Sequence, residues 1–359
     1  MKFDGIRKSL HQINKIRYRP LLMMKIASAY FKRVVLRQPV LRICEFSINT
    51  ACQSSCEFCY ASKFGRRGQS ILTIDEIKDT WRQAQAMGAF SSIVLGGEPL
   101  LHPRFLEIIE ALEPKKNIVT FTTNAIDFTE ALAKDLKRLG VYLINISINS
   151  RDAETNDRLR GFSGHLEKAF TAMRICKKNG FDVFLPIATS KPYWQETLKL
   201  IDFADKNGYG VTINLMSAMG RAEAKHTDMF DIEFWQELRK IYNSHANVRS
   251  DYDVNLSLRV GCPSGHEKVH IAPYGDVTGC SMQAPSFGNV REEPLAKIVA
   301  RMRKFHHYAK KSEHCLIAVD KEYIESYMDY AINEASVPYP IKNNPAYVHD
   351  MTHHSNVYK

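Results

Sequence analysis

The sequence predicts an α/β protein, a partial (βα)6 TIM-like barrel followed by a small α+β domain. From residue 43 onward, short runs rich in β-branched residues alternate with longer helical patterns, which is typical of parallel strands joined by helical crossovers. Six such units precede residue 245, too few to close an eight-stranded barrel. After residue 245 the pattern changes to a hairpin followed by helices, which indicates the second domain.

The predicted strands follow one another along the barrel, each ending in a polar segment. They span residues 43–48, 92–95, 118–122, 142–148, 183–188 and 211–215. One of the intervening helices is predicted over 74–87, where Thr73 and Glu76 have the spacing of a capping box. In the C-terminal part we predict a hairpin and two helices, at 269–272 with 277–280, 295–303 and 321–332.

Composition and pattern divide the chain into four segments. At 359 residues and 45% hydrophobic content it can bury one large core and a small additional domain. The segments are a basic amphipathic arm at 1–42, the barrel at 43–249, the second domain at 250–335 and a C-terminal tail at 336–359.

The basic charge of the chain is concentrated in the arm. Residues 1–42 hold eleven of the 49 basic residues and one of the 39 acidic residues, which leaves 38 of each elsewhere. The net charge of +10 therefore belongs to the arm, and the rest of the chain is neutral. The basic residues occupy only the arm, and no nucleic-acid-binding fold is recognisable. The sequence therefore does not favour a nucleic-acid partner.

Within the arm, residues 20–35 predict an amphipathic helix with Leu22, Ile26, Tyr30 and Val34 on one face. Its apolar run is far shorter than the roughly 20 residues that span a bilayer. Two interpretations stay open: the helix lies on an anionic membrane surface, or it packs on the barrel wall. In the first case the protein would be cytoplasmic and bound peripherally to the inner face of the membrane.

The strongest chemical signal is a loop of three cysteines, Cys52, Cys56 and Cys59, directly after the first predicted strand. Thiolates are the usual ligands of iron–sulfur clusters, and three of them can hold three irons of a 4Fe-4S cubane while the fourth iron stays open. A structural zinc site normally has four protein ligands, and nothing adjacent supplies the fourth. Free thiols of this kind favour a reducing cytoplasm. Cys44 and Cys176 are predicted core residues.

This C-x3-C-x2-C loop resembles the signature of the radical S-adenosylmethionine (SAM) superfamily, and the likeness continues over about residues 43–225. The resemblance implies that Cys52, Cys56 and Cys59 hold a 4Fe-4S cluster. It also implies reductive cleavage of SAM to a 5′-deoxyadenosyl radical, which abstracts hydrogen from a substrate. The electron would come from a flavodoxin or ferredoxin-type donor.

The same likeness implies which residues contact SAM. Gly96-Gly97-Glu98-Pro99 resembles the methionine-binding turn of the family; glycines let the backbone approach a ligand, and Glu98 can accept from an ammonium group. Polar residues at the ends of the third and fourth strands resemble the carboxylate and ribose contacts, although Asn149 stands where many relatives have Asp. The implied cofactor contacts are Tyr60, Gly96, Gly97, Glu98, Pro99, Thr123, Asn124, Ser147, Asn149 and Arg160.

The second domain has a cysteine pattern of its own. Cys262, a hairpin ending in Cys280, and Cys315 resemble the twitch domain, the short form of the SPASM auxiliary-cluster domain. The resemblance implies a second 4Fe-4S cluster with one iron left without a cysteine; that iron is open, or is bound by His314 or His266. The pairs His306-His307 and His353-His354 are predicted to be exposed surface residues.

The substrate class stays open at the level of sequence. The basic arm favours a lipid or lipid-linked sugar at a membrane, and the short second domain favours a soluble sugar or aminocyclitol that is dehydrogenated or epimerised. A peptide maturase ranks last, because no separate peptide-recognition domain is recognisable. A non-catalytic iron–sulfur or nucleic-acid-binding protein is the alternative from another class.

Overall fold

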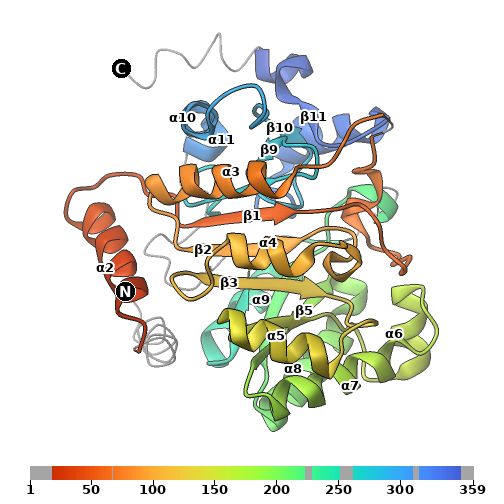
Figure 1. Ribbon diagram of the computed structural model, residues 1–359. Coiled ribbons are helices and arrows are strands. Elements are labelled where there is room, and N and C mark those ends of the chain that lie inside the picture. The colour runs from red at the N-terminus through yellow and green to blue at the C-terminus, as the bar shows by residue number, and fades with distance from the viewer. Residues whose placement is uncertain (1–17, 67, 223–228, 251–261, 310–314, 349–359) are drawn as a thin grey trace.

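The computed structural model describes residues 18–66, 68–222, 229–250, 262–309 and 315–348, and it shows one curled sheet surrounded by helices (Figure 1). The sheet has nine strands in the order β7-β6-β5-β4-β3-β2-β1-β8-β9. All neighbouring strands are parallel except β8 and β9. The strands are β1 Ile43–Ser47, β2 Ser91–Leu95, β3 Ile118–Thr123, β4 Leu143–Ile146, β5 Asp182–Thr189, β6 Gly210–Leu215, β7 Val248–Ser250, β8 Lys268–Ile271 and β9 Val277–Thr278.

This arrangement confirms the predicted fold class and adds two strands to the barrel. The six predicted strands correspond to β1–β6. The additions are β7, which pairs with β6, and β8, which pairs in parallel with β1, Ile43 facing Lys268. Strand β8 begins the predicted hairpin of the second domain, so that domain continues the barrel sheet instead of forming a separate layer.

Helices lie around the sheet, and those that follow β9 belong to the second domain. They are α2 Pro20–Val34, α3 Ile74–Ala86, α4 Phe105–Ala111, α5 Glu130–Leu139, α6 Ala153–Arg160, α7 His165–Lys178, α8 Trp194–Asn207, α9 Ile232–Ser244, α10 Leu295–Lys304, α11 His306–Ala309 and α12 Lys321–Tyr323. The predicted capping box of α3 is present, with Thr73 and Glu76 bonded reciprocally. The predicted helix at 321–332 is instead divided into α12, a π-helical turn and a 3-10 helix.

Helix α2 packs on the barrel at the starting ends of the strands (Figure 1). Leu22 and Ile26, two of the four residues of the predicted apolar face, are 0% and 5% exposed and lie against Phe90, with Ile118 and Tyr142 packed around them. The barrel-wall interpretation therefore holds for this face. A second apolar face, with Leu21, Met24, Phe31, Val34 and Val35, is exposed. Among the described residues no helix is long and apolar enough to cross a membrane.

Polar contacts fix α2 in this position. The Arg19 guanidinium donates to the carbonyl oxygens of Pro114 and Gly140 at 2.9 and 2.8 Å, and it lies over the ring of Tyr142. The Lys25 ammonium donates to Asn117 Oδ1 at 2.6 Å. Part of the basic charge of the arm therefore serves to attach it to the barrel.

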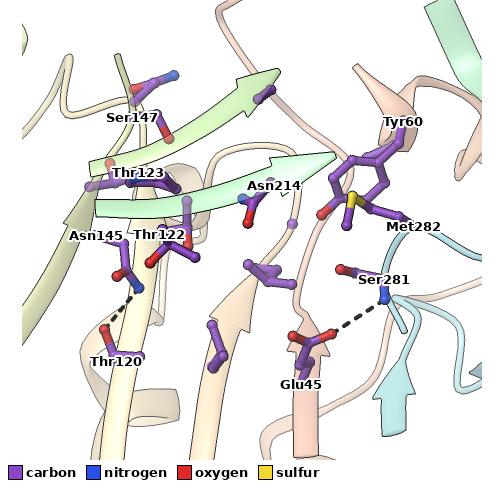
Figure 2. Close-up of a pocket in the computed structure, with 18 of the residues that line it drawn as sticks. Glu45, Tyr60, Thr120, Thr122, Thr123, Asn145, Ser147, Asn214, Ser281 and Met282 are labelled. Atoms are coloured by element: carbon purple, nitrogen blue, oxygen red, sulfur yellow. Dashed lines mark hydrogen bonds between the residues drawn. The ribbon is translucent and has the colours of Figure 1, made fainter. Parts of the chain in front are cut away.

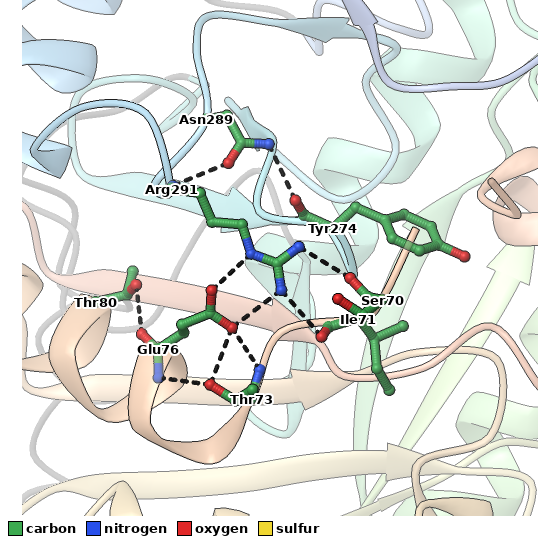
Figure 3. Close-up of polar contacts among 8 residues, drawn as sticks. All are labelled: Ser70, Ile71, Thr73, Glu76, Thr80, Tyr274, Asn289 and Arg291. Atoms are coloured by element: carbon green, nitrogen blue, oxygen red, sulfur yellow. Dashed lines mark hydrogen bonds and ion pairs between the residues drawn. The ribbon is translucent and has the colours of Figure 1, made fainter. Parts of the chain in front are cut away.

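An arginine clamp attaches the second domain to the barrel (Figure 3). Arg291 Nε donates to Glu76 Oε1 at 2.6 Å, and its two terminal nitrogens donate to the carbonyl oxygens of Ser70 and Ile71 at 2.9 and 3.1 Å. The contact with Arg291 lowers the pKa of Glu76 to about 2. Because Glu76 also belongs to the capping box of α3, one carboxylate stabilises both the helix start and the domain contact.

Two expectations for the C-terminal part are wrong. His306 and His307 are each 4% exposed rather than on the surface, because α11 turns them into an aromatic cluster with Phe305 and Tyr327. The expected tail packs on the second domain as far as it is described: strand β11 (Tyr339–Pro340) pairs with β10 (Pro285–Ser286). His353 and His354 lie outside the described residues.

Candidate active site

A cavity of about 290 Å³ runs along the inner face of the barrel, lined by every second residue of the strands (Figure 2). At the carboxyl ends of the strands it reaches the cysteine loop; at their starting ends it reaches Phe90, Ile118 and Tyr142. Those three residues also contact the helix α2 cluster, so α2 covers the base of the cavity. The carboxyl ends of parallel strands are where ligands bind in such architectures.

The three cysteines of the loop line one end of this cavity. All three are free thiols and close enough to influence one another electrostatically. Burial, with smaller effects of Glu98, Cys56 and Cys59, raises the pKa of Cys52 to about 11, and burial likewise raises that of Cys59. Three thiolates held this close need a cation to compensate their charge, which is the situation of a metal or cluster site.

The Gly-Gly-Glu-Pro turn lies directly against the chain that leads into the cysteine loop. Gly97 N donates to Asn49 O at 3.0 Å, and Glu98 N donates to Ala51 O at 2.7 Å. A Cβ on Gly97 would lie 2.3 Å from Ala51 O, so only glycine permits this approach. Asn49 Nδ2 closes the contact by donating to Glu98 O at 2.8 Å. The sequence analysis did not single out Asn49.

Glu98 is 1% exposed and joins the ends of β2 and β3. Its Oε1 accepts from Thr123 Oγ1 at 2.7 Å and from Leu100 N at 3.1 Å, while Oε2 accepts from Asn124 N at 2.7 Å. Burial nevertheless raises the pKa of Glu98 to about 7, because those bonds only partly offset the loss of hydration. An ammonium group bound beside it would favour the charged form.

The other implied cofactor residues divide into those that line the cavity and those that do not. Tyr60, Gly96, Thr123, Asn124, Ser147 and Arg160 line it. Asn124 Nδ2 lies 3.9 Å from Cys52 Sγ, and an Arg160 terminal nitrogen lies 4.0 Å from Cys56 Sγ. Asn149 is not among the lining residues, because its Nδ2 donates to Ala188 O at 2.8 Å, and Pro99 begins a 3-10 helix behind the turn.

Sequence reasoning missed several polar residues of the cavity wall. They are Glu45, Thr120, Asn145, Thr212, Asn214, Lys268 and Ser281. A signal existed for three of them: Thr120 lies two positions before the polar Thr122, and Thr212 lies two positions before Asn214, within β-branched strands. A period of two places such residues on one face of the sheet.

Two of the three cysteines of the second domain, Cys262 and Cys280, lie near a buried tyrosine. Tyr308 is 2% exposed; Gly265 and Gly279 leave room for its ring, and its hydroxyl donates to Gln283 Oε1 at 2.7 Å. Burial raises the pKa of Tyr308 well above its ordinary value, and the Cys262 and Cys280 thiols add to the effect. Those two cysteines therefore lie near one aromatic ring. Cys315 is half-buried against the same core.

Two family models match the chain. The model for the radical SAM superfamily matches residues 46–204, and the model for the SPASM iron–sulfur cluster-binding domain matches residues 262–317. The chain belongs to the radical SAM superfamily. The radical SAM domain binds a 4Fe-4S cluster and SAM, and the SPASM domain binds further iron–sulfur clusters.

The sequence of this radical SAM protein is similar to those of two named proteins. It is 24% identical over 284 residues to the AdoMet-dependent heme synthase of Methanosarcina barkeri, covering 72% of this chain and 81% of that protein. It is 25% identical over 232 residues to mycofactocin maturase MftC of Mycobacterium tuberculosis, covering 64% of this chain and 56% of MftC. This chain therefore spans little more than half of MftC.

A solved structure has the same fold. SuiB of Streptococcus suis, bound to precursor peptide SuiA, superposes with a TM-score of 0.57 at 18% identity. The match covers 73% of this chain and 65% of SuiB. At this identity the likeness establishes the fold alone.

The residues of this radical SAM barrel fit the cofactors of the family. Cys52, Cys56 and Cys59 would hold three irons, and the Gly97 turn leaves backbone close to the same end of the cavity. When bound, the cluster and SAM together supply the radical that takes hydrogen from a substrate. The protein residues would bind and orient SAM and exclude water: Glu98 would offer a carboxylate to the ammonium group of SAM, and the buried wall would shield the reacting space.

The raised pKa of Glu98 predicts a pH effect on SAM affinity. Below about pH 7 the carboxyl carries a proton that must leave before it can pair with an ammonium group. We therefore compare the affinity for SAM of the wild type with that of Glu98→Gln. The ratio of the two affinities should increase about tenfold per pH unit from pH 5 to 7 and stay constant above pH 7. Taking the ratio cancels the titration of SAM itself. Equilibrium dialysis with the reconstituted proteins measures it; a ratio that does not change with pH would refute the role of Glu98.

Proposed function

We propose that this radical SAM enzyme is a maturase that modifies a peptide. The observation that carries the proposal is the cavity wall, which both domains build: Tyr60 follows the cysteine loop, and Ser281 and Met282 follow Cys280 of the SPASM domain. Ser217 Oγ donates to Met282 O at 3.0 Å and ties the two halves together at this point. A substrate in the cavity would therefore contact both cluster-bearing domains.

The relatives support a peptide above the other substrate classes. MftC is by name a maturase, and SuiB has been solved with a precursor peptide. From the sequence alone, a peptide is the least favoured of the substrate classes and a lipid the most favoured. Leu22 and Ile26 of the arm that favoured the lipid are buried on the barrel, and neither a lipid nor a sugar is named among the relatives above. An electron from a flavodoxin or ferredoxin-type donor completes the proposed reaction.

A tetrapyrrole is the second candidate. The heme synthase is the relative above whose length this chain covers most fully, at 81%. The present cavity of about 290 Å³ would have to widen to admit a whole macrocycle. This makes the peptide, which can enter one side chain at a time, the better fit to the structure.

The experiment that tests the proposal follows hydrogen transfer. The anaerobically reconstituted enzyme is incubated with SAM, dithionite and deuterated peptides encoded next to its gene. The proposal expects deuterium in 5′-deoxyadenosine and a changed peptide mass, both dependent on the enzyme. An iron porphyrin with deuterated side chains is the parallel substrate; deuterium transfer from it, with none from any peptide, would refute the peptide proposal.

A further inference from the structure

The inner face of the barrel is polar where barrels of this kind are usually apolar. In closed barrels, branched apolar side chains fill these inward positions and pack a core. Here β3 presents Thr120 and Thr122, β4 presents Asn145, and β6 presents Thr212 and Asn214 to the cavity (Figure 2). Polar groups in that position are costly unless they are bonded, so each of them needs a partner from the protein or from a ligand.

Most of these polar groups are held in place by neighbours. Thr120 Oγ1 donates to Leu143 O at 2.9 Å and accepts from Asn145 Nδ2 at 3.1 Å. Thr212 Oγ1 accepts from Arg249 Nε at 3.0 Å. Residues two positions apart on a strand share a face, so the bonded Thr120 precedes Thr122 on the inner face of β3, and the bonded Thr212 precedes Asn214 on that of β6.

Asn214 differs from these residues. Its Oδ1 is buried and has no hydrogen-bond partner among the residues that the structure describes. A buried amide oxygen without a partner costs about the free energy of a hydrogen bond, which a ligand that donates to it would recover. Asn214 is therefore the part of this wall that is ready to receive a ligand.

The charged groups at the other side of the cavity compensate one another. Lys268 Nζ lies 3.1 Å from Glu45 Oε1, and both side chains are 3% exposed. Glu45 Oε2 also accepts from Ser281 N at 3.3 Å, in the SPASM domain (Figure 2). A ligand with a net charge would compete with this pair and leave one buried charge unpaired, which is strongly unfavourable.

Apolar side chains also line this part of the cavity. Ile93 and Leu95 of β2, Pro186 of β5, and Leu215 and Met282 contribute hydrocarbon surface to the cavity. Pockets of this composition bind the body of a ligand through apolar contact and fix its orientation through a few polar groups.

We propose that this part of the cavity is the substrate subsite, and that it takes an uncharged side chain ending in a carboxamide or hydroxyl group. Asn214 and Thr122 bind the polar end, and the apolar wall binds the stem. Carboxamides and hydroxyls both donate and accept, so they satisfy Asn214 in either orientation of its amide. The peptide context of this side chain rests on the function proposed above; the chemistry of its end does not.

The test uses small fragments without a peptide backbone on the reconstituted, SAM-loaded full chain. Butyramide, butyrate and butylammonium are compared by low-affinity calorimetry. Butyramide should bind at least about tenfold more tightly than either ion. Asn214→Leu, which keeps the size and removes the amide, should weaken butyramide about tenfold and leave the ions unchanged. If Asn214→Leu does not fold, Thr122→Val serves as the second variant. It should also weaken butyramide binding, by a smaller factor than Asn214→Leu.

The matched control is Asn243→Leu, which changes an exposed asparagine on α9 outside the cavity. It should bind all three fragments as the wild type does. Tightest binding of butyrate or butylammonium would overturn the proposal, as would butyramide binding that both cavity variants leave unchanged. If no peptide is modified but the fragments bind as expected, the proposed peptide function is wrong and the proposed subsite is correct.

Discussion

Replacing Cys56 with alanine should abolish 5′-deoxyadenosine formation by the reconstituted enzyme. Cys56 lies between Cys52 and Cys59 in the loop and, like them, lines the cavity. A cubane that loses one of three thiolates loses an iron ligand and with it the site that binds SAM. The loss should exceed about a thousandfold, since no neighbouring cysteine of the described residues lines the cavity as a replacement.

Cys176→Ala provides the control for this prediction. Cys176 is 0% exposed within α7 and far in sequence from the cysteine loop. Its replacement should cost about 1 kcal/mol of stability through lost packing and leave SAM cleavage intact. Chromatography of the quenched reactions measures both variants. Cleavage of SAM by the Cys56 variant at the wild-type rate would show that the cluster lies elsewhere.

Removing the auxiliary cysteines should halve the iron content. With a cubane in each domain, the wild type should hold about eight irons per chain after anaerobic reconstitution, and Cys262→Ala, Cys280→Ala, Cys315→Ala together should hold about four. The reason is that Cys262 and Cys280 already lie beside the same tyrosine, Tyr308, where a second cluster would have its ligands.

Iron and sulfide analysis measures this directly, and circular dichroism checks that the variant has folded. Because Cys280 is buried, its replacement also perturbs packing. The single variant of half-buried Cys262 therefore serves as the milder test and should lose the same iron. A wild type that holds only about four irons, all lost with the Cys52 loop, would refute the auxiliary site.

The sequence predicted those parts of the fold that depend on local pattern. Strands β1–β6 and the capping box of α3 follow from residue periodicity and from the spacing of Thr73 and Glu76. The pairing of β8 with β1 could not be predicted in this way, because it joins residues more than 220 positions apart. The burial of His306 and His307 was missed for a similar reason: Tyr327, whose ring packs against His307, comes from another segment.

For the candidate site, the cysteine loop and Gly-Gly-Glu-Pro turn stand out in the sequence because they are contiguous. The polar cavity wall does not, because Glu45, Asn145 and Asn214 lie on three different strands and meet only through the curl of the sheet. The arm was ambiguous for a different reason. Its helix has two apolar faces, and only the structure shows that the face with Leu22 and Ile26 packs on the barrel.

The most direct test of the whole account is SAM cleavage by the purified chain. The enzyme is reconstituted with iron and sulfide without oxygen and incubated with SAM and dithionite, and 5′-deoxyadenosine and methionine are quantified together. The account predicts that both products form in equal amounts and only when the cluster is reduced. A chain that holds iron on Cys52, Cys56 and Cys59 but yields no 5′-deoxyadenosine would contradict it.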